Sequence, residues 1–144
     1  MHRSRFAALV VFALLLVGCS EKGPARGPVK GRVTMGKQPV SGATVFFENA
    51  EAGVAMNAPL DADGNYEVKS YQGVGLPVGT YKVAVLPGGV MTADEQGPKA
   101  HEAKAKRPKP SVEIPEKYHK TASSGFTIEV KEGDNPPFNF DLAP

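Results

Sequence analysis

Tryptophan is absent from this 144-residue sequence, cysteine occurs once, and histidine occurs only at His2, His101 and His119. With a single cysteine the folded domain has no internal disulfide, so its stability must come from packing. The histidines are dispersed and stand in no H-x-x-E or H-E-x-x-H pattern, so the clustered ligands of a zinc peptidase are missing. We therefore predict no metal site and no cofactor.

An excess of charge of one sign is missing as well. The formal net charge is +2, and without residues 1–18 fifteen basic side chains face fifteen acidic ones. Nucleic-acid binding usually requires a clear basic excess, so we predict no nucleic-acid partner.

Long apolar runs are also rare, and the longest is the twelve-residue stretch from Phe6 to Val17. A helix needs roughly 20 apolar residues to span a bilayer, so this run is too short. It follows Arg3 and Arg5, which together with the run form the pattern of a secretory signal peptide.

The residues after this run, Leu16, Val17, Gly18 and Cys19, resemble the lipobox of bacterial lipoproteins. The resemblance implies cleavage before Cys19 and a diacylglycerol on its thiol. It also implies a third acyl chain, with palmitate as the expected fatty acid. By the same analogy Ser20 favours sorting to the outer membrane. The alternative is an ordinary signal peptide followed by an incidental cysteine.

We therefore expect a signal peptide at residues 1–18, a lipidated cysteine and tether at 19–27, and one domain at 28–144. The tether is polar and rich in Gly and Pro. Eight residues, 20–27, reach at most about 28 Å, so the domain should lie close to the membrane.

Apolar and polar residues alternate with a period of two along most of the predicted domain, and no useful helical period occurs. Alternation of this kind is typical of half-buried strands. Seven runs show it or are apolar enough to form a strand: 29–35, 43–48, part of 53–60, 65–70, 80–86, 125–131 and 138–142. The sequence therefore predicts an all-β fold, a seven-stranded antiparallel transthyretin/Ig-like β-sandwich.

The segment DADGNY, residues 61–66, has two readings: a calcium loop or a turn. A calcium loop of the EF-hand type needs Gly at its sixth position and Glu at its twelfth. Counted from Asp61, these positions hold Tyr66 and Gln72. Asp63-Gly64 is instead a strong hairpin signal, so we predict a turn with Asp61 and Asn65 bonded to local N–H groups.

Three segments together resemble the carboxypeptidase regulatory-like domain, a transthyretin-like β-sandwich. They are PVKGRVTMGKQPVSGATVFFE, DADGNYEV and GLPVGTYKVAV. The end of the chain, from Ile114 to Leu142, resembles that of small bacterial lipoproteins built on this domain. The shared motif residues are turn and core positions, so the resemblance implies a fold and no activity.

Enzyme hypotheses find little support. Transthyretin-like hydroxyisourate hydrolases use several histidines and arginines and end in Tyr-Arg-Gly-Ser, whereas this chain ends at Asp141–Pro144. Ser124 lies in no G-x-S-x-G context and more simply begins a strand. Tyr118 and His119 have two interpretations, packing against the sheet edge or a binding rim.

Residues 87–111 separate two predicted strands and are poor in large apolar side chains, which indicates a flexible loop. Five cations lie in its second half: Lys99, Lys104, Lys106, Arg107 and Lys109. They either form a solvated spacer or contact anionic headgroups or envelope polymers near the anchor.

We therefore expect a lipid-anchored cell-envelope protein with a non-catalytic structural or interaction domain, on the periplasmic side of the outer membrane. Its partners would be the membrane and an envelope protein or polysaccharide. One alternative is a carbohydrate-binding module, which needs coplanar exposed aromatics. The outward candidates are Phe46, Phe47 and Tyr71. A transthyretin-like hydrolase is the third reading.

Overall fold

The computed structural model describes residues 23–70, 73–89 and 108–144. In these ranges the chain is all-β, with one short 3₁₀ helix, η2 (Glu116–His119), and no α-helix. The strands are β1 (Arg26–Gly27), β2 (Lys30–Met35), β3 (Gln38–Pro39), β4 (Ala43–Asn49), β5 (Val54–Pro59), β6 (Asn65–Glu67), β7 (Lys69–Ser70), β8 (Gly73–Val74), β9 (Leu76–Pro77), β10 (Gly79–Pro87), β11 (Phe126–Val130) and β12 (Phe140–Leu142). Each of the seven predicted runs contains a strand, and the run at 65–70 contains both β6 and β7.

The first main sheet has the order β11-β10-β4-β5, and every pair in it is antiparallel. Its long central strands, β4 and β10, supply much of the core because every second residue along them is apolar and points to the same face of the sheet. Val45, Phe47, Tyr81 and Val83 are fully buried there.

The second main sheet has the order β12-β2-β3, and β6 pairs with β2 beside β3. β12 runs parallel to β2, with Phe140 opposite Val33, so the prediction of a wholly antiparallel fold is wrong at this pair. No tight turn joins these strands, since they come from opposite ends of the chain. Residues 131–139 carry the chain from β11 across to β2, and this crossing sets the direction of β12.

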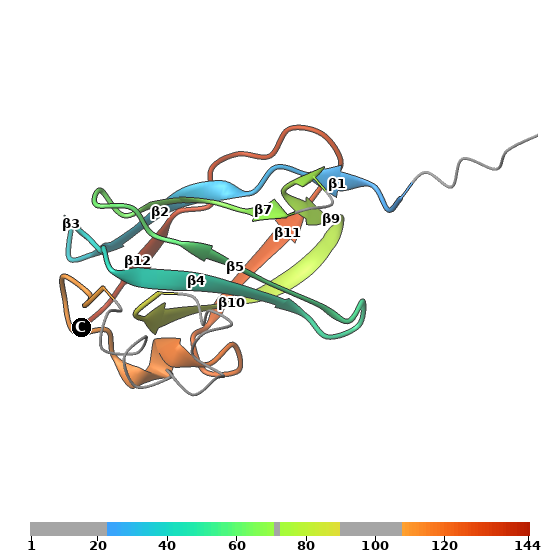
Figure 1. Cartoon of the computed structure of the whole chain (residues 1–144). Coiled ribbons are helices and arrows are strands. Elements are labelled where there is room, and N and C mark those ends of the chain that lie inside the picture. The colour runs from blue at the N-terminus through green and yellow to red at the C-terminus, as the bar shows by residue number, and fades with distance from the viewer. Residues whose placement is uncertain (1–22, 71–72, 90–107) are drawn as a thin grey trace, which may run out of the picture.

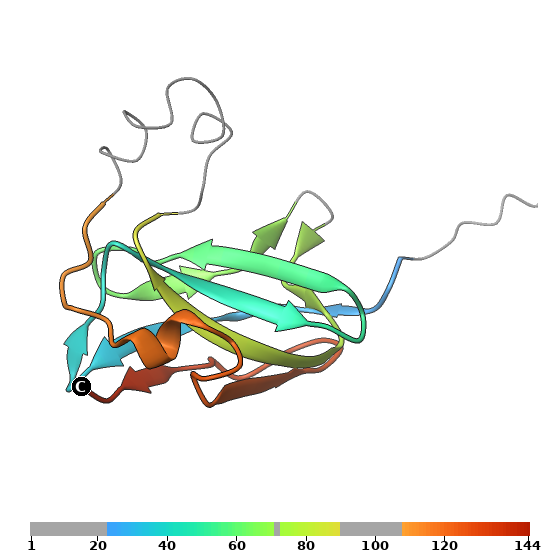
Figure 2. The ribbon, with the colours of Figure 1, turned by 90° about the horizontal axis from the view of Figure 1, so that it is seen from below.

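The core lies between the two sheets and is linked by aromatic contacts (Figures 1 and 2). Phe47 of β4 meets Tyr66 of β6 with ring centroids 5.7 Å apart, and Tyr66 stacks on Phe140 at 6.2 Å. Phe140 in turn contacts Phe126 of β11 at 5.0 Å. Aromatic residues of both sheets therefore form one continuous cluster.

Two turns show how local sequence shapes the path of the chain. Gly36 and Lys37 join β2 to β3 with φ values of 55° and 74°, the two positive values that a type I′ hairpin requires. The turn predicted at Asp61–Asn65 is present, but the hairpin that Asp63-Gly64 indicates is wrong. β5 pairs with β4 and β6 pairs with β2, so this turn passes from one sheet to the other.

The domain has two distinct ends. β1 pairs with β9 at the end where the described chain begins, and the C-terminus lies at the other end (Figures 1 and 2). The described flanks of the 87–111 segment are also at that other end, since Gly88 N–H donates to Gly42 O and Ser111 N–H donates to Ser41 O. β10 runs between the ends and covers about 27 Å over its nine residues. Within the described ranges, no helix has the length and apolar character that a membrane span requires.

Candidate functional site

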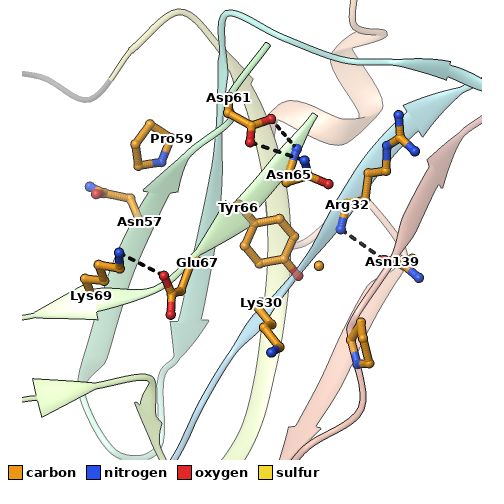
Figure 3. Close-up of a pocket in the computed structure, with 12 residues that line it drawn as sticks. Lys30, Arg32, Asn57, Pro59, Asp61, Asn65, Tyr66, Glu67, Lys69 and Asn139 are labelled. Atoms are coloured by element: carbon orange, nitrogen blue, oxygen red, sulfur yellow. Dashed lines mark hydrogen bonds and ion pairs between the residues drawn. The ribbon is translucent and has the colours of Figure 1, made fainter. Parts of the chain in front are cut away.

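A depression of about 970 Å³, lined mostly by charged and polar residues, lies over β2 and β6 (Figure 3). Its walls come from four separate segments of the chain: Lys30–Arg32 of β2, Asn57 and Pro59 of β5, residues 61–69, and residues 137–139. These segments meet only because β6 lies beside β2 and the chain before β12 returns along the other side of β2.

Gly31 and Tyr66 shape the floor of this depression. The two residues are opposite each other in the β2–β6 pair, and the Tyr66 hydroxyl donates to the carbonyl of Phe138 at 2.7 Å. A Cβ atom at Gly31 would lie 1.9 Å from that carbonyl oxygen, so only glycine lets the Tyr66 side chain and residue 138 approach β2 this closely. Burial raises the pKa of the Tyr66 hydroxyl, which remains a proton donor at all ordinary pH values.

The charged side chains of the depression differ in how fully they are engaged. Glu67 and Lys69 form an ion pair at 2.9 Å, which raises the pKa of Lys69. Arg32 Nε donates to Asp63 O at 2.9 Å, which holds the guanidinium in place near the Asp61 carboxylate, while its terminal nitrogens form no hydrogen bond within the described ranges. The ammonium group of Lys30 likewise forms no ion pair within the described ranges.

Asp61 closes the depression at the turn and acts as a turn carboxylate. Its side chain accepts hydrogen bonds from the N–H groups of Asp63 and Asn65, at 2.9 and 2.8 Å, and from the Asn65 amide. The Asn65 N–H bond is the main cause that holds the pKa of Asp61 below its ordinary value. The predicted local bonding of Asp61 is confirmed, whereas the Asn65 side chain bonds to Asp61 and not to a backbone N–H.

Three cations and two carboxylates therefore line the depression, together with the side-chain amides of Asn57, Asn65 and Asn139. Its described lining includes no serine, cysteine or histidine. Across the described ranges, no group of three or more His, Cys, Asp or Glu side chains is arranged to hold a metal ion. The arrangement is suited to holding an anionic or hydroxyl-rich ligand through hydrogen bonds.

Most of the predicted site residues lie outside the described ranges. These are Cys19, the lipobox residues Leu16, Val17 and Gly18, the aromatic candidate Tyr71, and four cations of the basic segment, Lys99, Lys104, Lys106 and Arg107. Lys109 is described and exposed, and its carbonyl oxygen lies against Gly42.

Tyr118 and His119 are tied into the fold. The Tyr118 side chain is 5% exposed, stacks on Phe126 at 5.3 Å, and accepts a hydrogen bond from Ala143 N–H through its hydroxyl. The half-buried His119 ring bonds to Ile114 O. These contacts favour the packing interpretation over a binding rim, because the aromatic ring of Tyr118 is not available to a ligand.

Ser124 and the aromatic candidates Phe46 and Phe47 lie in or beside the first main sheet. The Ser124 hydroxyl donates to Val83 O and accepts from Phe126 N–H, so Ser124 lies just before β11, which begins at Phe126 and not at Ser124 as predicted. Phe47 is completely buried, so its interpretation as an outward aromatic is wrong. Phe46, its neighbour on the opposite face of β4, is partly buried. The aromatic platform of a typical carbohydrate-binding module is therefore not formed by this pair.

Sequence reasoning missed the depression itself. Lys30 and Arg32 occupy the polar positions of an alternating strand, which is the one signal that marks them in the sequence. Comparisons with protein-family models, with curated proteins and with solved structures found no match for this chain.

Proposed function

We propose that the protein is a bacterial lipoprotein, anchored through Cys19 to the envelope and more specifically to the periplasmic face of the outer membrane. Residues 28–144, together with β1 at Arg26–Gly27 from the predicted tether, would form a non-catalytic interaction domain, a carboxypeptidase regulatory-like, transthyretin-like β-sandwich with seven main strands. Two features support this fold: strands occur in all seven predicted runs, and both main sheets share one core. The parallel β12 is a departure from a simple antiparallel sandwich.

The observation that carries the anchored function is the small number of residues between Cys19 and the first strand of the folded domain. β1 begins at Arg26, seven residues after the cysteine, and it pairs with β9 at one end of the domain. Seven residues span at most about 25 Å. A lipid on Cys19 would therefore hold the β1 end next to the bilayer.

Replacement of Cys19 by Ser tests the anchor. We expect the variant to lose metabolic labelling by fatty acid and to leave the membrane fraction, because two or three acyl chains hold a protein firmly in a bilayer. Ser20→Ala is the matched control and should keep both properties. Undiminished label in the Cys19→Ser chain would disprove lipidation at this residue.

The geometry also bears on the partner of the basic segment. Its described flanks leave the domain at the end opposite β1, about the length of β10 away. This favours envelope polymers over headgroups beside the anchor as the binding partner of its five cations. A chain with all five cations changed to Gln should then lose salt-sensitive binding to cell-wall material and keep its membrane attachment. Equal binding with and without the charges would leave the segment as a spacer.

A second function, binding of an acidic glycan, is supported by the free donors of the depression. Lys30 and Arg32 lie two residues apart on one face of β2, beside the Asn139 amide. We expect Lys30→Gln with Arg32→Gln to abolish binding of an oligogalacturonate, measured by calorimetry. The control is Lys82→Gln with Lys131→Gln. It removes two exposed positive charges from the other main sheet, one on β10 and one directly after β11. No binding by the unchanged chain, or equal loss in both variants, would exclude this function.

A further inference from the structure

Two large apolar side chains stand out on the described surface. Val74 is 56% exposed and Val78 is 45% exposed, and they are the large hydrophobic residues that the structure leaves open to solvent. Isolated exposed valines are ordinary in proteins. These two are notable for their position, because both lie at the end of the domain that carries β1.

Backbone contacts hold the segment with these valines against β1. Val78 N–H donates to Ala25 O at 2.9 Å, and the register of β1 and β9 places Gly27 opposite Leu76. A Cβ at Gly75 would lie 1.9 Å from Gly27 O, so the chain next to Val74 is packed directly on this strand.

Arg26 adds a side-chain tie at the same place. Its guanidinium donates to Gly75 O at 2.7 Å and to the Ser70 hydroxyl at 3.2 Å. The strand that leads back to Cys19 and the segment that bears the two valines therefore form one unit, which Figure 1 shows at the β1 end of the domain.

We propose that this end of the domain, through Val74 and Val78, docks on the headgroup–acyl boundary of the bilayer that holds Cys19. The inference rests on the proposed lipid anchor. The seven-residue connection keeps this end within about 25 Å of the membrane, so the apolar surface can be buried there. The domain would then stand with the C-terminal end, where the flanks of the 87–111 segment lie, directed away from the bilayer.

The charges at this end predict how docking responds to salt. Lys69 is paired with Glu67, and around Gly27 the turn after β11 carries Lys131 next to Glu132 and Asp134. With Arg26 these side chains balance, so a basic patch does not drive the contact. Docking should therefore persist at high salt, unlike an electrostatic contact of the basic segment.

The absence of tryptophan and the single cysteine make a direct test available. Residues 19–144 are coupled through Cys19 to a maleimide phospholipid in phosphatidylethanolamine–phosphatidylglycerol vesicles. Three separate variants each carry a single tryptophan. Val74→Trp and Val78→Trp place the indole at the β1 end, and the control Gln38→Trp places it at the opposite end. We expect acyl-brominated lipids to quench residues 74 and 78 several-fold more than residue 38, at low and at high salt. Equal quenching at all three positions, or none, would overturn the proposal.

A second experiment keeps the native valines, because a tryptophan could itself seek the membrane. In nanodiscs that contain a gadolinium-chelating lipid, the NMR signals of the Val74 and Val78 backbone amides should be broadened far more than the signal of the Gln38 amide. Val74→Ser with Val78→Ser should remove this difference, and Val74→Ile with Val78→Ile should preserve it. Broadening that is uniform, or unchanged in the serine pair, would contradict docking. Because the coupling is chemical, these results do not depend on whether cells lipidate Cys19.

Discussion

Replacing Gly31 with Ala should separate β2 from the segment before β12. The added Cβ would lie 1.9 Å from Phe138 O and 2.6 Å from the Phe138 carbonyl carbon, far inside ordinary contact. Both atoms belong to the backbone, so no side-chain rotation relieves the clash. The φ angle of Gly31 lies outside the left-handed region, which means that the steric contact itself decides the outcome.

The cost follows from the hydrogen bonds at this contact. Moving residues 138–139 away from β2 weakens the bond from Phe138 N–H to Lys30 O, that from Arg32 N–H to the Asn139 side chain, and that from Tyr66 OH to Phe138 O. At about 1 kcal/mol each, less the small gain of Ala over Gly in a strand, the loss is about 2 kcal/mol. Urea unfolding followed by circular dichroism should show a midpoint lowered by about 1 M.

Two comparisons make this result interpretable. Gly89→Ala is the matched control, since its Cβ would meet only the Pro108 ring, at ordinary distances of 3.6 and 3.8 Å, and it should unfold like the unchanged chain. In a Tyr66→Phe background, Gly31→Ala should cost about 1 kcal/mol less, because one of the affected bonds is already gone. An unchanged midpoint for Gly31→Ala would mean that residue 138 does not approach β2 as described.

Three further predictions concern the turns and the core. Lys37→Asn should raise the free energy of unfolding by about 0.5 kcal/mol, because Asn tolerates the left-handed backbone at φ 74° better than Lys; a lower urea midpoint would contradict this. Ile128→Ala and Phe140→Ala should each cost about 2–5 kcal/mol, since both side chains are buried, while the exposed Glu129→Ala should be nearly neutral by thermal melting. The folded-state pKa of Asp61 is lowered from 3.8, so its contribution to stability is present above that pH and is lost as the pH falls through the folded value. Asp61→Asn should therefore weaken the loss of stability in acid, and an identical pH profile would refute the role of this carboxylate.

Much of the fold could be predicted because strand formation depends on a local pattern. Alternation placed Val45 and Phe47 on one face of β4 and Phe46 on the other, and the core has that arrangement. The turn at Asp61–Asn65 was equally readable, since it depends on a few adjacent residues. The buried state of Phe47 followed from the same alternation, and treating it as an outward aromatic ignored that pattern.

The candidate site could not be predicted in this way because its parts are far apart in the sequence. Lys30, Asn57, Glu67 and Asn139 meet only when β6 lies beside β2 and residues 137–139 return along the other side. DADGNY identified a turn, but its residues contain no information on whether the next strand pairs with β5 or crosses to the other sheet. That choice depends on which arrangement buries Tyr66 against Phe47 and Phe140.

The sequence by itself determined the all-β class, the position of most strands and the turn at Asp61, because each follows from the spacing of neighbouring residues along the chain. Only the tertiary structure decided the parallel direction of β12, the depression over Gly31, and the meeting of Val74 and Val78 with β1 at one end. These features depend on contacts between segments tens of residues apart. Such contacts are selected by packing of the whole core, which no local pattern encodes.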